Sequence, residues 1–325
     1  MDWIVPMEPI LTPNIPEDNG FVHQVKWDGI RGLCYIESGK VRLFTKRGRE
    51  RTAFYPELLD LPSFLMGKSA VLDGEIIILN EEMRPSFQLS LIRERVSAPK
   101  QVHYYAKKYP VLYIVFDLLA LNGGLITGKP LHERSSLLRD NLRTSNVTTI
   151  TDDFYNGSEL FSLMKEKGWE GIVSKKADST YLPGKTHREW FKTKLSRKIL
   201  AIVVGLALKD GFPNSLVLAI SGNEGLVYIG RASIGLTQEH FRLLKDNIPA
   251  LKADQNPLSK IEEKKETSLL SKNARELKFV VWLKPQLTVW ISFLEWTSDG
   301  GLRHPKILGF TSLAPEEANG KEFIE

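Results

Sequence analysis

Two almost continuously apolar runs in the first half of the chain constrain its fold more than any other feature. They read AVLDGEIIIL at residues 70–79 and VLYIVFDLLAL at residues 111–121. Runs of this length and composition are typical of strands that are buried on both faces. Glu75 and Asp117 lie within them. Because an unpaired charge in an apolar segment is costly, Glu75 is expected to have a partner.

Short strands and a helix flank these two runs. The segment GSELFSLMKEKG at residues 157–168 predicts a helix that Ser158 caps and Gly168 ends. It leads into WEGIVSKK, which has the pattern of a strand. Further strands are predicted at residues 21–25, 33–36 and 41–45, the last two joined by a turn at residues 38–40.

The pattern changes near Leu195. After it, β-branched runs separated by turn signals dominate, and they predict about five strands and a small barrel. These runs are ILAIVVGLAL, NSLVLAIS, GLVYIGRA, FVVWLK and LTVWISFLEW. A charged stretch at residues 252–272 interrupts them and is predicted to be a solvated loop or linker. The 325 residues therefore suit an α+β protein of two domains, residues 1–195 and 196–325.

Cysteine content and hydropathy exclude several classes of protein. The single cysteine, Cys34, excludes an internal disulfide and a multi-cysteine zinc site. No apolar run approaches the roughly 20 residues that a membrane-spanning helix requires. The first residues, MDWIVPMEPI, lack the pattern of a secretion signal, so we expect a cytoplasmic protein without a membrane partner. The net charge of +5 is compatible with a polyanionic partner, although charge alone says little.

Lys26 stands at the end of the first predicted strand, in HQVKWDGIRG. A lysine acts as a nucleophile only when it is desolvated or lies near other cations. Taken alone, the pattern KxDG is more simply a solvated lysine followed by a turn that contains Asp28. Other cations belong to segments that flank strands or turns, where sites are often assembled. They are Arg31, Lys46, Arg47, Lys175, Lys192 and Lys194.

Six segments in a fixed order resemble the nucleotidyltransferase motifs of the ATP-dependent DNA ligases, the RNA ligases and the capping enzymes. They are KWDGIRG, LFTKRGRE, LDGEI, YIVFDLLALNG, EGIVSKK and WFKTKL. The resemblance covers residues 6–194. The segment FLEWTSDGGLRHPKILGF at residues 293–310 is similar to the closing segment of bacterial ligases related to ligase D. The resemblance implies a nucleotidyltransferase (adenylation) domain with antiparallel sheets and flanking helices at residues 1–195. It also implies an OB-fold β-barrel at residues 196–325.

The same resemblance implies a reaction. Lys26 attacks the α-phosphate of ATP, forms a lysine–AMP phosphoramidate and releases pyrophosphate. AMP then moves to the 5′-phosphate of a nick, and the 3′-hydroxyl displaces it. Asp28 of the same motif has a catalytic role, and Lys192 and Lys194 resemble the motif lysines that contact the transferred phosphate. These two lysines are two residues apart on a predicted strand, so their side chains share one face.

The resemblance also implies a nucleotide and metal site. Phe116 matches the aromatic residue that stacks on adenine, and Arg31 the arginine that contacts the ribose. Glu75 and Glu170 are the expected ligands of Mg²⁺ or Mn²⁺. Without the motifs, Phe116 would be interpreted as a residue of the hydrophobic core, and each glutamate as the salt-bridge partner of a neighbouring lysine. The expected nucleotide contacts are Gln24, Val25, Lys26, Arg31, Lys46, Arg47, Glu75, Phe116, Lys175, Lys192, Lys194 and Arg303.

At three places in the sequence, the contact with the nucleotide is not decided. Gln24 replaces the glutamate that typically accepts from the adenine amino group; its amide oxygen can also accept, but the amide can rotate, which predicts weak labelling of Lys26 by GTP. Lys46 occupies the usual arginine position with Arg47 beside it, and either can reach the ligand. Arg303 and His304 are candidates for a nucleotide-facing tip, the alternative being an exposed turn.

The predicted function is ATP-dependent sealing of nicked double-stranded DNA by a monomer that binds phosphates rather than bases. DNA end-binding repair proteins are further candidate partners. The alternatives are an RNA ligase or capping enzyme, or a catalytically inactive DNA-end-binding module. The carboxylates among the cations argue against a pure binding surface. An NAD-dependent ligase is disfavoured because one cysteine cannot build a four-cysteine zinc module.

Overall fold

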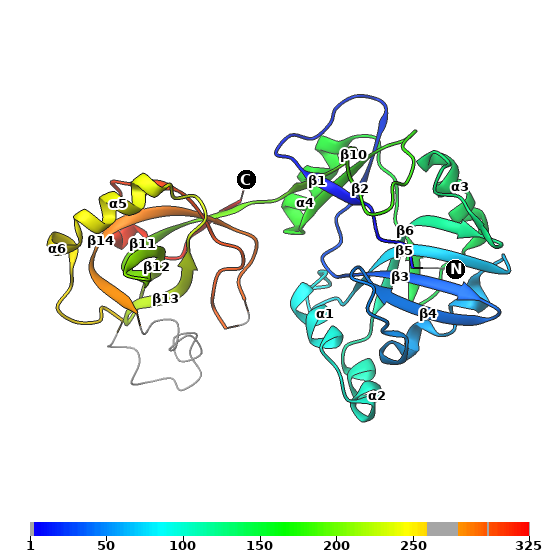
Figure 1. The fold of residues 1–325 in the computed structure, drawn as a ribbon, viewed down its shortest axis with the longest axis horizontal. Helices are drawn as coiled ribbons and strands as arrows, with labels where there is room; N and C mark the ends of the chain where they lie inside the picture. Colours follow the sequence, from blue (N-terminus) through cyan, green and yellow to red (C-terminus); the bar gives the residue numbers. More distant parts are fainter. Residues whose placement is uncertain (1–2, 259–278, 298, 325) are drawn as a thin grey trace. The chain divides into compact units, whose positions relative to one another are not determined.

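The computed structural model describes residues 3–258, 279–297 and 299–324. Contacts between Cα atoms divide the chain into two units, Met1–Leu195 and Ser196–Glu325 (Figure 1). Each unit is built mainly from antiparallel strands with a few helices, as predicted for an α+β protein. Within the described ranges, no helix is long and apolar enough to cross a membrane.

The smaller sheet of the first unit has four strands in the order β1, β10, β9, β2. The first pair is parallel, and the other two pairs are antiparallel. The strands are β1 (Glu8–Leu11), β2 (Phe21–Val25), β9 (Gly171–Lys176) and β10 (Thr186–Lys194). The first and last strands of the unit are therefore neighbours in this sheet.

The larger sheet of the first unit has six strands. Five follow the order β4, β3, β5, β6, β7, and β8 pairs with β6 in parallel. Their bounds are β3 (Ile30–Glu37), β4 (Lys40–Thr45), β5 (Ser69–Ile77), β6 (Leu112–Leu121), β7 (Gly124–Leu125) and β8 (Thr148–Ile150). The two apolar runs of the sequence form β5 and β6, side by side in the middle of the sheet.

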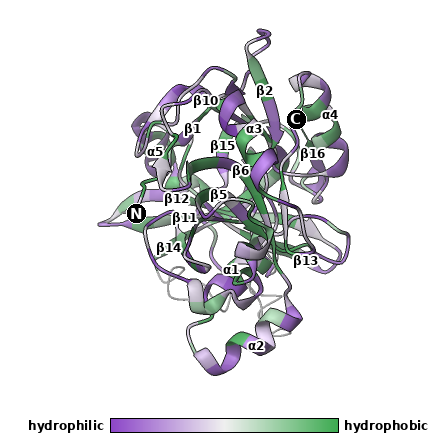
Figure 2. Ribbon diagram, turned by 90° about the vertical axis from the view of Figure 1, so that its right-hand side faces the viewer, coloured by the Kyte–Doolittle hydropathy of each residue, from purple (hydrophilic) through white to green (hydrophobic). Residues whose placement is uncertain are grey.

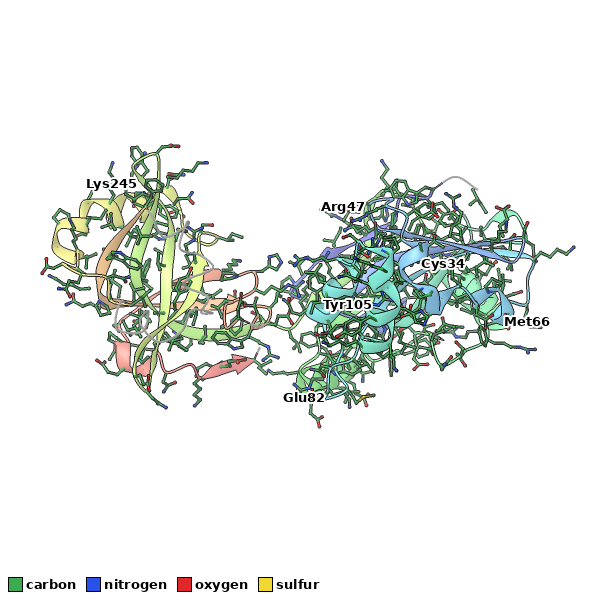
Figure 3. All side chains as sticks on the ribbon, turned by 90° about the horizontal axis from the view of Figure 1, so that it is seen from below. Cys34, Arg47, Met66, Glu82, Tyr105 and Lys245 are labelled. Carbon is green, nitrogen blue, oxygen red and sulfur yellow. The ribbon has the colours of Figure 1, made fainter. Side chains whose placement is uncertain are left out.

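Both faces of β5 and β6 are buried, which confirms the prediction. On one face, Leu72 and Val115 belong to the main core of the unit. On the other face, Val71 packs in a second cluster that also contains Met7 and Trp190 of the smaller sheet region. The second cluster therefore joins the two sheets, and it fixes the strand ends that carry the site. Cys34 is buried in the main core, whereas Met66 and Glu82 lie at the surface (Figure 3).

Four helices belong to this unit: α1 (Phe87–Glu94), α2 (Pro99–Lys108), α3 (Leu131–Asn141) and α4 (Gly157–Lys167). Short 3-10 helices lie at Thr52–Phe54, Pro56–Leu58 and Leu61–Phe64. Figure 2 shows the contrast between hydrophobic β5 and largely hydrophilic α2. The cap predicted at Ser158 is wrong, because the Asn156 side chain accepts from the amide of Glu159. Gly168 ends α4 as predicted, in the left-handed conformation with φ 65°.

The second unit contains one antiparallel sheet in the order β13, β12, β11, β14, β15, with β16 paired to β11. The strands are β11 (Arg197–Lys209), β12 (Phe212–Gly222), β13 (Gly225–Ala232), β14 (Val280–Phe293), β15 (Lys306–Thr311) and β16 (Glu322–Ile324). The described part of the unit also contains helices α5 (Gln238–Asp246) and α6 (Ile248–Leu251) and a 3-10 helix at Pro315–Glu317. Lys245, labelled in Figure 3, lies on α5.

Three expectations for this unit are corrected. The runs FVVWLK and LTVWISFLEW are one strand, β14, and its register shifts opposite residues 203–205 around Pro285, which cannot donate a ladder bond. Strands β15 and β16 were not expected. In place of the predicted barrel, the described ranges form a six-stranded sheet with β13 and β15 at its ends. No continuous ladder joins these two strands there, and one isolated bridge links Ile234, just after β13, to Lys306 of β15. Of the predicted loop at 252–272, residues 259–272 lie outside the described residues.

Candidate active site

Lys26 directly follows β2, where the chain leaves the smaller sheet for the larger one. Its backbone amide donates to the carbonyl of Gly171 at 2.9 Å, which continues the pairing of β2 with β9. Gly29 then passes so close to β5 that a Cβ atom would lie 2.3 Å from the carbonyl oxygen of Ile76. Only glycine fits there. The spacing of lysine and glycine in KWDG thus matches the crossing from one sheet to the other.

Glu170 binds two of the predicted site lysines. Its Oε2 accepts from Lys26 Nζ and its Oε1 from Lys194 Nζ, each at 2.6 Å. Burial alone would raise the pKa of Glu170, but the attraction and hydrogen bonds of the two lysines outweigh burial and lower it. The salt bridge left open by the sequence is therefore present. Both carboxylate oxygens accept from lysines here, which makes Glu170 a partner of the nucleophile candidate.

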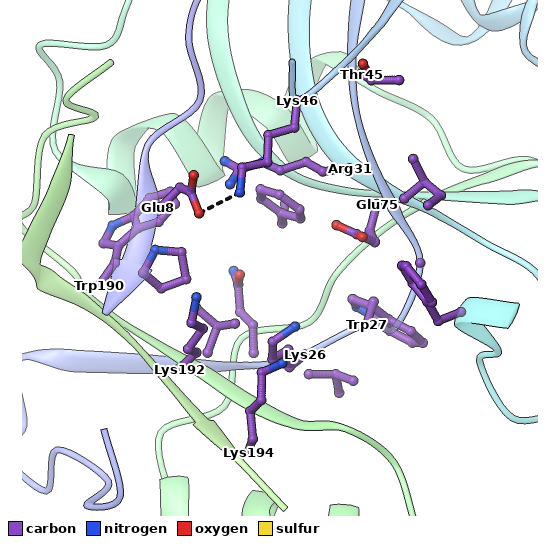
Figure 4. Close-up of a pocket in the computed structure, with 18 of the residues that line it drawn as sticks. Glu8, Lys26, Trp27, Arg31, Thr45, Lys46, Glu75, Trp190, Lys192 and Lys194 are labelled. Atoms are coloured by element: carbon purple, nitrogen blue, oxygen red, sulfur yellow. Dashed lines mark ion pairs between the residues drawn. The ribbon is translucent and has the colours of Figure 1, made fainter. Parts of the chain in front are cut away.

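A cavity of about 800 Å³ opens beside Lys26 (Figure 4). Lys26, Lys192 and Lys194 border it, and Glu75 lies across from them. Burial, together with repulsion from Lys26 and Lys194, lowers the pKa of Lys192. Every nucleotide contact predicted in the first unit lines this cavity. They are Gln24, Val25, Lys26, Arg31, Lys46, Arg47, Glu75, Phe116, Lys175, Lys192 and Lys194.

Lys175 lies between two aromatic rings of the cavity wall. Its Nζ is 4.6 Å from the ring centre of Phe116 and 4.3 Å from that of Trp190. The side chain is buried, and burial lowers the pKa of Lys175 to about 8. Trp190 lines the cavity as well, and the sequence reasoning missed it. An aromatic position in the segment WFKTKL was the available signal.

Arg31 is fixed by a buried carboxylate. Its Nε and Nη2 donate to the two oxygens of Asp73 at 2.9 and 2.6 Å, and the Tyr181 hydroxyl donates to Asp73 at 2.7 Å. Although burial opposes its charge, the pKa of Arg31 is raised by Asp73. The guanidinium also lies 5.3 Å from the centre of the Phe116 ring. Bidentate pairing of this kind holds an arginine in one orientation. The sequence reasoning missed Asp73 and Tyr181.

Glu75 is the predicted metal ligand that lines the cavity. Burial raises its pKa to about 8, against the opposing attraction of Lys26 and Arg31. In the described part of the chain, no three His, Cys, Asp or Glu side chains converge on a metal position. Mg²⁺ is commonly held by one or two carboxylates together with substrate phosphates and water. The donors present therefore fit a metal that a bound nucleotide helps to hold, with Glu75 as the protein ligand.

Lys46 and Arg47 both line the cavity, so its geometry does not choose between them. Lys46 Nζ forms an ion pair with Glu8 Oε2 at 2.7 Å, drawn as the dashed line in Figure 4. Burial tends to raise the pKa of Glu8, but Lys46 outweighs it and the pKa is lowered. Glu8 also lines the cavity and was missed by the sequence reasoning.

Some predicted residues lie elsewhere. Asp28 follows Lys26 but does not itself line the cavity, and Glu170 reaches it only through its two lysines. Arg303 belongs to the second unit, where its Nη1 donates to Glu295 at 2.6 Å. His304, beside it, is exposed and has a left-handed backbone with φ 51°.

Comparison with protein families gives two matches in chain order. The model of an ATP dependent DNA ligase domain matches residues 12–194. The model of an ATP dependent DNA ligase C terminal region matches residues 209–312. The first match ends at Lys194, the last lysine of the cavity.

Individual relatives agree with the family models. The multifunctional non-homologous end joining protein LigD of Mycobacterium bovis is 31% identical over 282 residues, which cover 86% of this chain and 34% of that protein. This chain therefore spans about a third of the length of that relative. The SPbeta prophage-derived DNA ligase-like protein LigB of Bacillus subtilis is 33% identical over 208 residues, 63% of this chain and 73% of that protein.

Solved structures extend the similarity over almost the whole chain. The ligase domain of LigD from M. tuberculosis has a TM-score of 0.52 and 28% identity, covering 97% of both chains. A mycobacterial DNA ligase D complexed with ATP and MES has a TM-score of 0.51 with the same identity and coverage.

Proposed function

Because this chain belongs to the family of ATP-dependent DNA ligases, we propose that it seals nicks in DNA and that Lys26 is the residue that carries AMP. One observation supports this assignment above all others. Lys26 borders a nucleotide-sized cavity, with Glu170 as its ion-pair partner and Lys192 and Lys194 beside it. A nucleophile, a proton acceptor and cations for phosphate oxygens are what phosphoryl-type transfer to an amine requires.

In the proposed first step, the Nζ atom of Lys26 bonds to the α-phosphorus of ATP as the bond to pyrophosphate breaks. Lys26 must first lose a proton, and the Oε2 atom of Glu170 lies 2.6 Å away to accept it. Lys192 and Lys194 stabilise the charge that develops on the phosphate oxygens. A divalent metal bound near Glu75 would add further charge stabilisation.

We assign Met1–Leu195 as the adenylation domain and Ser196–Glu325 as the OB-fold domain. Phe116 and Trp190 offer aromatic faces for adenine, and Arg31 is held ready for the ribose by Asp73. Arg303 is proposed to contact the nucleotide from the OB-fold domain. Asp28 is proposed to act beside Lys26 from the turn before β3.

The second and third steps use nicked double-stranded DNA as the substrate. AMP passes from Lys26 to the 5′-phosphate, and the 3′-hydroxyl then displaces AMP as the phosphodiester forms. The mycobacterial relative LigD is named for non-homologous end joining, so DNA end-binding repair proteins are proposed partners. We further propose a cytoplasmic monomer that uses Mg²⁺ or Mn²⁺.

A single assay tests the proposed function. The protein is incubated with α-labelled ATP and Mg²⁺ or Mn²⁺, and then chased with nicked DNA or, in parallel, nicked RNA. We expect covalent label that disappears on the DNA chase as sealed product forms. A label that requires GTP would indicate a capping enzyme, and a chase that works only on RNA an RNA ligase. Absence of any label would indicate a binding module and overturn the proposal.

DNA binding is expected to be strongly salt-dependent and nearly independent of sequence. Each phosphate neutralised by lysine or arginine gives a slope of about −0.9 in the logarithm of affinity against the logarithm of salt concentration. Several contacts therefore predict a steep loss of affinity between low and physiological salt. Nicked duplexes of unrelated sequence, titrated over a salt series, provide the measurement. A nearly flat salt dependence, or strong selection for one sequence, would contradict binding through phosphates.

A further inference from the structure

Gln24 is held in one orientation by a carboxylate from another part of the chain. It lies on β2, is 3% exposed and lines the cavity. Its Nε2 atom donates to Asp153 Oδ1 at 2.7 Å. A carboxylate only accepts hydrogen bonds, so the amide must present its NH₂ group to Asp153. The Oε1 atom is left as the acceptor of this side chain.

Asp153 is itself anchored. Arg139 on α3 donates from Nη2 to Asp153 Oδ2, the oxygen that Gln24 does not use. The backbone beside Asp153 is tied to β2, because Phe154 and His23 exchange two amide–carbonyl hydrogen bonds of 2.8 Å each. Trp27 Nε1 also donates to Thr151 Oγ1 at 3.2 Å. The carboxylate is therefore fixed relative to the strand that carries Gln24 and to Lys26 at its end.

This arrangement distinguishes the two purine bases. The adenine edge carries an amino donor at the position where guanine carries a carbonyl acceptor. A fixed Gln24 Oε1 atom can accept a hydrogen bond from the adenine amino group, whereas it repels the guanine carbonyl. Rotating the amide to donate to guanine would turn Oε1 toward the Asp153 carboxylate, setting two acceptors against each other at hydrogen-bond distance.

We propose that Asp153, held by Arg139, is a positioning residue that fixes the Gln24 amide and thereby selects ATP over GTP. The inference rests on the proposed function, in which Gln24 contacts the base and Lys26 takes the label. It revises the expectation from the sequence that a freely rotating amide permits labelling by GTP. The carboxylate behind the amide removes that freedom.

The first test replaces the anchor with alanine. Self-nucleotidylation is measured for wild type and Asp153→Ala with labelled ATP and GTP under identical metal and salt. We expect the ATP-to-GTP preference to fall at least about tenfold, the order of one hydrogen bond to a charged group. A general loss of folded protein would lower both rates together and leave the ratio unchanged. The matched control is Asp152→Asn, an exposed neighbouring carboxylate, which is expected to keep the wild-type ratio.

The second test exchanges the charges. Gln24→Glu alone places a carboxylate against Asp153 and should lower labelling by ATP at least about tenfold. Adding Asp153→Asn supplies an amide whose NH₂ donates to the new carboxylate and whose oxygen accepts from Arg139. The double variant is expected to recover ATP labelling to within about threefold of wild type.

The outcomes separate the two levels of proposal. Wild-type protein that takes no label from either nucleotide refutes the proposed function. Normal ATP labelling with an unchanged ATP-to-GTP ratio in Asp153→Ala, or a double variant no better than Gln24→Glu, refutes the role of Asp153 while leaving the proposed function standing.

Discussion

Replacing Lys26 by alanine is expected to abolish covalent labelling by α-labelled ATP. Alanine has no nucleophile, and the effective concentration gained by holding an amine beside the α-phosphate is lost with it. Lys26→Arg should be equally inactive, because a guanidinium keeps its proton in proteins. The label is measured on a denaturing gel and located by peptide mapping in the wild type.

The control for this experiment is Lys185→Ala, an exposed lysine outside the cavity, which should label normally. Folding of each variant is checked by thermal unfolding. Mapping of AMP to a lysine other than Lys26 in the wild-type protein would contradict the assignment of Lys26 as the nucleophile.

The second large effect is expected at Lys175. Lys175→Met should slow labelling by about a hundredfold, the scale of removing one preorganised donor from an active site. The same change should raise the melting temperature near neutral pH, because a buried ammonium is replaced by an apolar chain. Asp117 is bound by Arg134 and Asp73 by Arg31, so these carboxylates near Lys175 keep a partner.

The pH dependence of the stabilisation by Lys175→Met tests whether the buried charge is its cause. Folding lowers the pKa of Lys175 from 10.5 to about 8, so between these values the unfolded chain binds more protons and wild-type stability rises with pH. The penalty, about 3 kcal/mol, is therefore complete below pH 8 and fades toward pH 10.5. Lys175→Met should melt about 5 to 10 °C higher at pH 7 and lose this advantage at high pH. Lys176→Met, at the exposed neighbour, should show neither effect. A constant difference at every pH would argue against a buried charge as the cause.

Local patterns in the sequence were sufficient to predict most of the strands that carry the site, but not β1, which carries Glu8. The apolar runs of β5 and β6 could be shielded from water only between two buried layers. The short strands near Lys26 were bounded by residues that favour turns. The predicted nucleotide contacts of the first unit follow from ordered motifs, and the cavity gathers them because these motifs lie in or beside strands of the two sheets. Elements of the second unit were harder, since β14 continues through Pro285 and only the pairing with β11 shows that it is one strand.

The partners of the site residues could not be predicted in the same way. Asp73 accepts from Arg31 and from Tyr181, and Asp153 accepts from Gln24. These contacts span long sequence separations, so the topology determines them and the local sequence pattern does not. Of these three residues, Asp73 was the easiest to predict from the sequence. An unpaired charge in an apolar run is costly, and this reason for expecting a partner of Glu75 applies equally to a carboxylate two residues earlier in the same run.

The parallel pairing of β1 with β10 has a consequence for biosynthesis. Glu8 and Leu11 pair with Thr186 and Lys192, so the earliest strand of the adenylation domain waits for the latest one. Contacts this distant in sequence form late, after the entropy of closing a long loop has been overcome. A nascent chain that has emerged from the ribosome only as far as β9 lacks Lys192 and Lys194. Of its two lysine partners, Lys26 and Lys194, Glu170 then has only Lys26. Because Lys192 and Lys194 are the proposed phosphate contacts, truncated products of interrupted translation are expected to be unable to capture AMP, and nucleotide would be consumed only once the domain is complete.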